Sequence, residues 1–277
     1  LLLLSWQLLI FMRLESYLIK NSFYCIIRLI NYLCIFMLEV IMEFQDKVVL
    51  VTGGTRGIGR QISLDFANEG AIVIANYYHD DNSASSLISD NIDVYKADIS
   101  SEEEVKKMID DIISKYKKID ILVNNAGISN DSLFEDKTKD SFMKILEVNL
   151  VGAFLVSKYA FKYMENGSII NISSTNGIDT NYIYSLDYDA SKAGLISLSA
   201  NLSKLSSKVR VNTNCPGWVD TDMNKDMDLE FKNEELSKIM LNRFGTCKEM
   251  SNVCLFLASS KASYVNNAII RVDGGKR

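Results

Sequence analysis

Short, almost continuously apolar runs alternate with longer amphipathic segments from Met42 to the end of the chain. Apolar residues recur at helical spacing between the runs, most clearly from Phe142 to Tyr159 and from Gly194 to Leu205. The runs are rich in β-branched residues, which is typical of strands buried on both faces of a parallel sheet. They cover residues 47–53, 71–77, 92–98, 120–127, 167–173, 209–217 and 268–274. The pattern predicts a single α/β domain over residues 42–277, a Rossmann-type doubly wound parallel sheet of about seven strands flanked by helices.

The first 41 residues follow a different pattern, because they contain no Gly, Ala, Pro, Asp or Thr and are rich in Leu, Ile, Phe and Tyr. Arg13, Glu15, Lys20 and Arg28 interrupt this segment, so it has no charge-free stretch of about 18 residues, as a membrane span needs. It also lacks the basic start and small-residue cleavage site of a signal peptide. We interpret residues 1–41 as an apolar N-terminal extension, either upstream sequence translated by mistake or a membrane-associating segment. We expect a cytoplasmic protein, with membrane association only if this extension is real.

Charge and composition exclude several classes of function. The net charge is −5 and no dense Lys/Arg tract occurs, so we expect no nucleic-acid partner. The five cysteines form no CxxC motif and the single histidine is His79, so we expect neither a metal site nor Ser-His-Asp catalysis.

A glycine-rich turn, TGGTRGIG (residues 52–59), follows the first predicted strand directly. Glycines at 53, 57 and 59 allow a tight turn and the close approach of a ligand to the backbone. The helix that follows offers unpaired N–H groups to an anion. The spacing is GxxxGxG, and its place between a strand and a helix favours a dinucleotide pyrophosphate over a turn without a ligand.

The end of the second strand bears on the choice of cofactor. NAD-binding folds usually place an acid there for the ribose 2′-hydroxyl, whereas this chain has Asn76 and Tyr77 and no acid before Asp80. Arg56, in the glycine-rich turn, can donate charge-assisted hydrogen bonds to a 2′-phosphate. We therefore predict a preference for NADP(H), with NAD(H) as the alternative.

The segment YDASK (188–192) places a phenol and an ammonium group one helical turn apart. A cation beside a phenol lowers the pKa of the phenol, and a phenol tuned in this way can act as a general acid or base. Taken alone, Tyr188 and Lys192 are better explained as an exposed tyrosine and a solvated lysine. The catalytic interpretation depends on the motifs around them.

Eight motifs occur in one order along the chain: TGGTRGIG (52–59), AD (97–98), NNAG (124–127), Asn149 in VNLVG, ISS (172–174), YDASK (188–192), PGWVDT (216–221) and VDGG (272–275). Together they resemble the short-chain dehydrogenase/reductase family, most closely the β-ketoacyl-[acyl carrier protein] reductases. The resemblance implies that Tyr188 exchanges a proton with the substrate oxygen and that Lys192 lowers the pKa of Tyr188. It also implies that Ser174, rather than its neighbour Ser173, holds the substrate oxygen, and that Asn149 belongs to a proton relay.

The resemblance further implies a set of cofactor contacts from six segments of the chain. They are Thr52, Gly53, Thr55, Arg56, Gly57, Ile58, Gly59, Asn76, Tyr77, Asp98, Ile99, Asn125, Ala126, Gly127, Tyr188, Lys192, Pro216, Gly217, Val219 and Thr221. Asn124 and Asn125 have a structural interpretation as well, because asparagine side chains commonly bond nearby backbone.

The expected activity is hydride transfer between a nicotinamide and a carbonyl or secondary alcohol. The first expected substrate is a 3-oxoacyl thioester, carried on acyl carrier protein; a sugar, polyol or steroid dehydrogenase and a catalytically silent scaffold are the alternatives. Tyr182, Tyr184 and Trp218 are read as walls of the substrate pocket, or else as core or interface aromatics. Basic residues for docking an acidic carrier are expected at Lys158, Lys162 and Lys204, and the resemblance implies a homotetramer paired through helices 139–164 and 189–206.

Two segments depart from the family pattern. Residues 79–91 are few for the usual helix between the second and third strands, and VNNAI (265–269) replaces the commoner Val/Ile-Thr-Gly stretch before the last strand.

Overall fold

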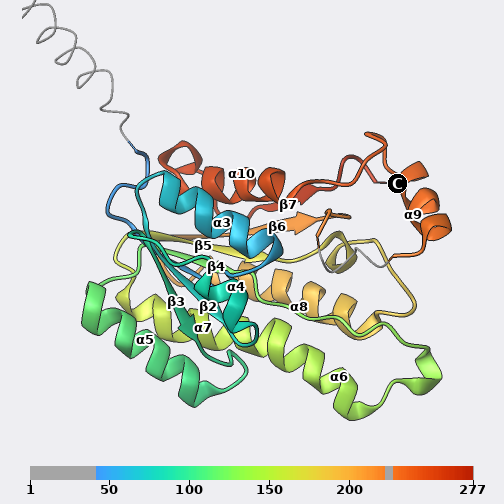
Figure 1. Ribbon diagram of the computed structural model, residues 1–277, viewed down its shortest axis with the longest axis horizontal. Coiled ribbons are helices and arrows are strands. Elements are labelled where there is room, and N and C mark those ends of the chain that lie inside the picture. Colours follow the sequence, from blue (N-terminus) through green and yellow to red (C-terminus); the bar gives the residue numbers. More distant parts are fainter. Residues whose placement is uncertain (1–41, 222–226, 277) are drawn as a thin grey trace, which may run out of the picture. The chain divides into compact units, whose positions relative to one another are not determined.

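A seven-stranded parallel sheet forms the centre of the computed structural model, which describes residues 42–221 and 227–276 (Figure 1). The strand order is β3-β2-β1-β4-β5-β6-β7. From β1 the chain adds strands first on one side, as β2 and β3, and then on the other side, as β4 to β7. This is a doubly wound sheet, which confirms the predicted fold class. Residues Glu43–Arg277 form one compact unit. The prediction of an apolar extension over residues 1–41 lies outside the described residues.

The strands lie where the apolar runs predict them. The central strands are buried because helices cover both faces of the sheet, whereas the edge strands β3 and β7 are partly exposed. Their bounds are β1 Val48–Val51, β2 Ile72–Tyr77, β3 Ile92–Lys96, β4 Ile121–Asn124, β5 Gly167–Ile172, β6 Val209–Pro216 and β7 Ile269–Val272. All six pairings between neighbours are parallel.

Helices cover the two faces of the sheet in separate layers (Figure 1). One layer holds α3 (Gly57–Asn68) and α10 (Cys247–Ala258), and the other holds α5 (Glu102–Tyr116), α7 (Ala153–Ala160) and α8 (Leu186–Leu202). Shorter elements are α4 (Asp81–Ser85), α6 (Lys139–Leu146), α9 (Leu229–Ser237) and the 3-10 turns η1 (Phe134–Asp136), η3 (Phe161–Tyr163), η4 (Thr175–Gly177) and η6 (Ser260–Ala262). Within the described ranges, every helix is too short or too polar to cross a bilayer.

The helix predicted over residues 139–164 is not uniform. It begins as α6 after the N-cap Thr138, passes through a π-helical turn at Glu147–Gly152 (η2), and continues as α7 and η3. A π turn inserts an extra residue into the helix and is frequent at functional sites. Here it contains Asn149, which the sequence assigned to the site.

The two departures from the family pattern have simple structural outcomes. Residues 79–91 hold only the five-residue helix α4, as their number predicts. Before β7, Asn267 has φ 60°, a conformation that asparagine tolerates better than most residues and that suits the position of a glycine. Asn266 accepts a hydrogen bond from Val211 N at 2.8 Å, so these asparagines tie the turn to β6.

Candidate active site

The predicted site residues meet at the carboxyl edge of the sheet. The glycine-rich turn follows β1, Asn76 and Tyr77 end β2, and Asp98 and Ile99 follow β3. Residues 125–127 follow β4, Ser174 follows β5, and residues 216–221 end and follow β6. Parallel α/β sheets bind ligands at this edge, near the point where the strand order reverses.

The glycines of the turn after β1 lie in places where a side chain would be strained or would clash. Gly53 and Gly57 have φ 60° and 51°, in the left-handed region that favours glycine. A Cβ on Gly59 would lie 2.1 Å from the carbonyl oxygen of Gly53. The turn leads into α3, whose first N–H groups can bind an anion. This cradle fits a dinucleotide pyrophosphate.

The side chains of Thr52 and Asn125 fix the turn against the end of β4. The Thr52 hydroxyl accepts hydrogen bonds from Asn125 N and Ala126 N at 3.0 and 3.1 Å. Asn125 Nδ2 donates to the carbonyl oxygens of Thr52 and Gly53, both at 3.0 Å. Asn125 therefore supports the cradle from behind, in agreement with its structural interpretation.

The residues expected to choose the cofactor differ in their exposure. Asn76 is buried, and its amide donates to the carbonyl oxygen of Ala97 at 3.0 Å, so it joins β2 to the end of β3. Arg56 is exposed, and its guanidinium lies 3.8 Å from the carboxylate of Asp80. Hydrogen bonds from Ser83 hold the pKa of Asp80 below its usual value. The end of β2 carries no acid, but the Asp80 carboxylate a few residues later lies beside Arg56.

The remaining cofactor segments lie after β3 and β6. A Cβ on Gly57 would lie 3.8 Å from Cγ2 of Thr221, so the segment after β6 approaches the glycine-rich turn. Asp98 Oδ1 accepts hydrogen bonds from the Ser100 amide and hydroxyl at 2.9 and 2.6 Å, which orients its carboxylate. Val219 is buried and bridges to Gly245.

Ser174, Tyr188 and Lys192 are brought together between β5 and α8. The Ser174 hydroxyl accepts a hydrogen bond from Asn176 N at 3.2 Å, and it lowers the pKa of the Tyr188 phenol. Lys192 Nζ lies 5.4 Å from the centre of the Tyr188 ring and donates to the Ile172 carbonyl oxygen at 2.8 Å. Ser173 points the other way, because its hydroxyl is buried and donates to the Lys192 carbonyl oxygen at 2.8 Å. The strand alternation thus presents Ser174 to the phenol.

The pKa of Tyr188 moves in the direction opposite to the sequence prediction. Burial raises it to about 12, and the hydrogen bond from Ser174 offsets only part of that increase. Burial also lowers the pKa of Lys192 to about 8. Both shifts arise because the surroundings disfavour the charged form of each group. As a whole residue, Tyr188 is partly exposed to water.

Asn149 is buried in the π turn and connects three parts of the site. Its amide donates to the Ile128 carbonyl oxygen and to Ser191 Oγ at 2.9 and 3.0 Å, and its Oδ1 accepts from Ile128 N at 2.8 Å. A Cβ on Gly127 would lie 3.3 Å from Lys192 Nζ and 3.4 Å from Asn149 Oδ1. A glycine at 127 therefore keeps the space beside the lysine open.

An aromatic cluster contains the residues that the sequence assigned to pocket walls. Tyr182 contacts Tyr184 and Phe231, and Trp218 contacts Phe231 and Phe244, with ring centres 5.3–6.1 Å apart. Phe231 belongs to α9, so this helix joins the segment before Tyr188 to the segment after β6. The Trp218 ring nitrogen also donates to Glu235 of α9 at 2.6 Å.

The lysines proposed for docking a carrier lie at the wrong end of the molecule. Tyr188 is in the first turn of α8, and Lys204 follows the end of that helix, roughly 21 Å farther along its axis. Lys162 lies in η3, whose Tyr163 carbonyl oxygen accepts from Ile119 N, just before β4 begins. Lys158, nearby in α7, pairs with Glu102 at 2.9 Å. The proposed docking role of these three lysines is therefore wrong.

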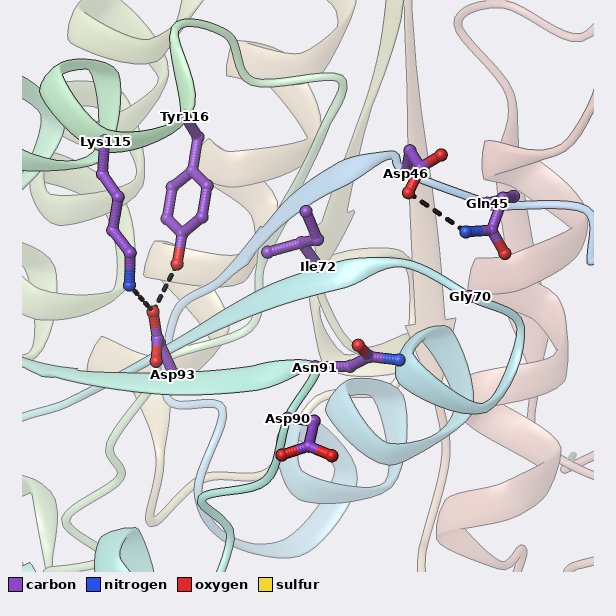
Figure 2. A pocket seen from close by; sticks show the side chains of 9 residues that line it. All are labelled: Gln45, Asp46, Gly70, Ile72, Asp90, Asn91, Asp93, Lys115 and Tyr116. Carbon is purple, nitrogen blue, oxygen red and sulfur yellow. Dashed lines mark hydrogen bonds and ion pairs between the residues drawn. The ribbon is translucent and has the colours of Figure 1, made fainter.

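A polar cavity of about 350 Å³ also lies away from the site, where β1, β2 and β3 begin (Figure 2). In Figure 2, Lys115 and Tyr116 of α5 both point to the carboxylate of Asp93. Its lining contains none of the predicted site residues. We assign it no role in catalysis.

Sequence reasoning missed a buried ion pair next to the site. Lys137 Nζ lies 2.8 Å from both carboxylate oxygens of Asp187, the residue before Tyr188. The only signal in the sequence was an acid beside the tyrosine, because Lys137 lies 50 residues away.

The fold and the site together define an oxidoreductase that uses a nicotinamide dinucleotide. A family profile described as enoyl-(acyl carrier protein) reductase matches residues 53–277. The chain belongs to the short-chain dehydrogenase/reductase family.

Curated relatives and solved structures agree on this family. A 3-oxoacyl-[acyl-carrier-protein] reductase of Thermotoga maritima is 37% identical, over 84% of this chain and 99% of its own. The reductase of the same name from Aquifex aeolicus is also 37% identical, over 84% and 98%. A Serratia marcescens short-chain dehydrogenase/reductase matches with a TM-score of 0.80 at 30% identity, over 84% and 98%. An aldohexose dehydrogenase of Thermoplasma acidophilum matches with a TM-score of 0.75 at 33% identity, over 83% and 94%.

Proposed function

We propose that the protein is an NADP(H)-dependent reductase of 3-oxoacyl thioesters. The observation that supports the catalytic part is the position of Lys192 Nζ, 5.4 Å from the centre of the Tyr188 ring, with the Ser174 hydroxyl lowering the pKa of the same phenol. The substrate part draws on similarity to relatives named 3-oxoacyl-[acyl-carrier-protein] reductase.

The dinucleotide supplies the hydride when it is bound. The glycine-rich turn and the first amides of α3 bind its pyrophosphate, and Gly127 leaves room for the ribose next to Lys192. Ser174 and Tyr188 hold the substrate oxygen between two hydroxyl groups. Tyr188 then donates its proton to that oxygen, which suits a phenol that burial keeps protonated.

Tyr188 must regain a proton after each turnover, and Lys192 and Asn149 take part in returning it. The Lys192 ammonium is next to the phenol and is held by the Ile172 carbonyl oxygen. Asn149 keeps the backbone at Ile128 in place on the other side of Gly127. In this arrangement Lys192 returns a proton to Tyr188, and Asn149 holds the neighbouring backbone in place.

The cofactor preference rests on Arg56. We expect Arg56→Ala to raise the KM for NADPH about tenfold or more, because charge-assisted hydrogen bonds to the 2′-phosphate are lost. The KM for NADH should change less than about twofold, since Arg56 makes no side-chain cap of α3 that the substitution could remove. Initial rates with both cofactors measure the effect.

Asp80→Asn is the matched control for that substitution. It removes the carboxylate that competes with a phosphate for Arg56 and should lower the KM for NADPH. Equal effects of Arg56→Ala on both cofactors would contradict the assignment.

A substrate panel tests the proposed activity. Acetoacetyl thioester, crotonyl thioester and an aldohexose represent a 3-oxoacyl reductase, the enoyl reductase named by the family profile, and a sugar dehydrogenase. We expect kcat/KM for the acetoacetyl thioester to be at least about a hundred times higher than for the crotonyl thioester or the aldohexose. A preference for the hexose would replace the substrate part of the proposal.

We also propose that the protein is a homotetramer. The π turn and α7 expose Val151 and Phe154 at 38% and 42%, and α8 exposes the small residues Ala193 and Ser197. Apolar and small side chains allow two helices to pack closely across a two-fold axis. Light scattering at micromolar concentration should give the mass of four chains, and a monomer would contradict the proposal.

A further inference from the structure

Lys137 and Asp187 form the most deeply buried ion pair among the described residues, with side-chain exposures of 5% and 0%. The Lys137 ammonium donates to both carboxylate oxygens at 2.8 Å and to the Asn130 carbonyl oxygen at 2.6 Å. The Asp187 carboxylate also accepts from the Tyr188 amide at 2.9 Å. All three lysine N–H groups therefore have acceptors, as a buried charge requires.

The pair joins the segment 128–138 to the beginning of α8. Asn149 holds the first residue of this segment, Ile128, at both its N–H and its carbonyl oxygen. Ser132 N donates to the Tyr184 carbonyl oxygen at 3.0 Å in the middle of the segment. Lys137 then fastens its far end to Asp187. The segment is thus held between Asn149 and the residue that precedes Tyr188.

A pair of apolar side chains could fasten these elements without the cost of desolvating two charges. Removing one partner of such a pair leaves an uncompensated buried charge, and here the Asp187 carboxylate is hydrogen-bonded to the Tyr188 backbone amide. The intact pair is neutral, so it adds little net electrostatic potential at the Tyr188 phenol. The same pair therefore holds segment 128–138 in place without adding a net charge near the tyrosine.

We propose that Lys137 and Asp187 are positioning residues, whose ion pair fixes segment 128–138 on the first turn of α8 and balances the charge beside Tyr188. This inference rests on the proposed function of Tyr188 as the proton donor. Other groups that influence the pKa of Tyr188 or contact its ring stay in place: Lys192 and Asp189 on α8, Asp131 in the segment, Ser174 after β5 and Cys215 on β6. The pair is therefore tested by changing its two charges separately and together.

The experiment compares Lys137→Met, Asp187→Asn and the double variant by the pH dependence of kcat for thioester reduction. At high pH kcat falls as Tyr188 loses its proton, and this fall is the alkaline limb of the profile. Lys137→Met leaves the Asp187 anion unpaired, which stabilises the neutral phenol and should move the alkaline limb upward by roughly one pH unit. Asp187→Asn leaves a cation and should move the limb downward. The double variant, which removes both charges, should return the limb to the wild-type position.

The matched control is Lys139→Met, which removes an exposed lysine charge two residues away and should leave the limb unmoved. Each single change at the pair should also lower Tm by several degrees, with most of the loss recovered in the double variant. Identical pH profiles in all the variants would overturn the charge-balancing role. A double variant that resembles either single variant would overturn the coupling.

The inference stays testable if the thioester is not a substrate, an outcome that would contradict the proposed function alone. The ionisation of Tyr188 is then followed by tyrosinate absorbance in the protein loaded with NADP⁺. Each variant is compared with the same variant carrying Tyr188→Phe, so that the difference reports this tyrosine. Opposite displacements in the two single variants would support the inference, and coincident curves would overturn it.

Discussion

Tyr188→Phe is expected to lower kcat for thioester reduction by at least about a hundredfold, because a positioned general acid contributes roughly 10²–10⁴ to a rate. The substitution removes only the hydroxyl and keeps the ring against Lys192. Binding of NADPH, measured by fluorescence titration, should change less than about threefold. The loss therefore belongs to kcat.

Tyr184→Phe provides the matched control for Tyr188→Phe. Tyr184 precedes α8 by two residues and is 38% exposed, and the same atom is deleted. We expect its kcat to stay within about twofold of the wild type. Retention of more than half the activity in Tyr188→Phe would remove this residue from the mechanism, and an equal loss in both variants would point to a structural effect.

Ser174→Ala is expected to lower kcat by about 10²-fold, as the loss of one donor to a developing oxyanion does in other enzymes. In the proposed mechanism Ser174 and Tyr188 both hydrogen-bond the substrate oxygen, so the substitution leaves that oxygen with a single hydrogen-bond partner. The variant should bind NADPH normally. Stopped-flow single turnovers separate this loss in the chemical step from any change in product release.

Ser173→Ala tests whether the alternation along the chain after β5 is assigned correctly. Its hydroxyl bonds the Lys192 carbonyl oxygen inside the protein, so its loss should lower Tm more than it lowers kcat. If Ser173→Ala loses more activity than Ser174→Ala, the assignment of the substrate-binding serine is reversed.

The fold could be predicted from the sequence because most strands are short and apolar, and longer segments with helical spacing separate several of them. Buried parallel strands require this composition, and right-handed crossovers leave few ways to order them. The π turn around Asn149 could not be predicted, since residues 139–164 show one continuous helical period. Its position depends on the hydrogen bonds between Asn149 and Ile128, which lie in different elements.

The candidate site was predictable where one short motif contains the relevant atoms. Tyr188 and Lys192 lie one turn apart on α8, and the glycines of the turn after β1 all lie within residues 53–59. The direction of the Tyr188 pKa was not predictable, because it depends on burial by residues from other elements. The approach of Asp80 to Arg56 likewise depends on the path of residues 78–80 after β2.

Position along a helix explains the error over the docking lysines. A crossover helix starts near the carboxyl edge of a parallel sheet and returns toward the opposite edge. Residues near the end of α7 or after α8, such as Lys158 and Lys204, are therefore carried away from a site built around Tyr188. The amphipathic pattern predicts the helices that carry these lysines. The position of each lysine along its helix decides how far it lies from Tyr188.

The most direct test of the central claim is the rate of NADPH oxidation by the full chain with acetoacetyl thioester, with NADH as the second cofactor. We expect turnover that requires the thioester and has a kcat/KM at least about tenfold higher with NADPH than with NADH. Tight binding of NADPH without oxidation of the cofactor by this substrate would contradict the proposed activity, and equal rates with both cofactors would contradict the role of Arg56.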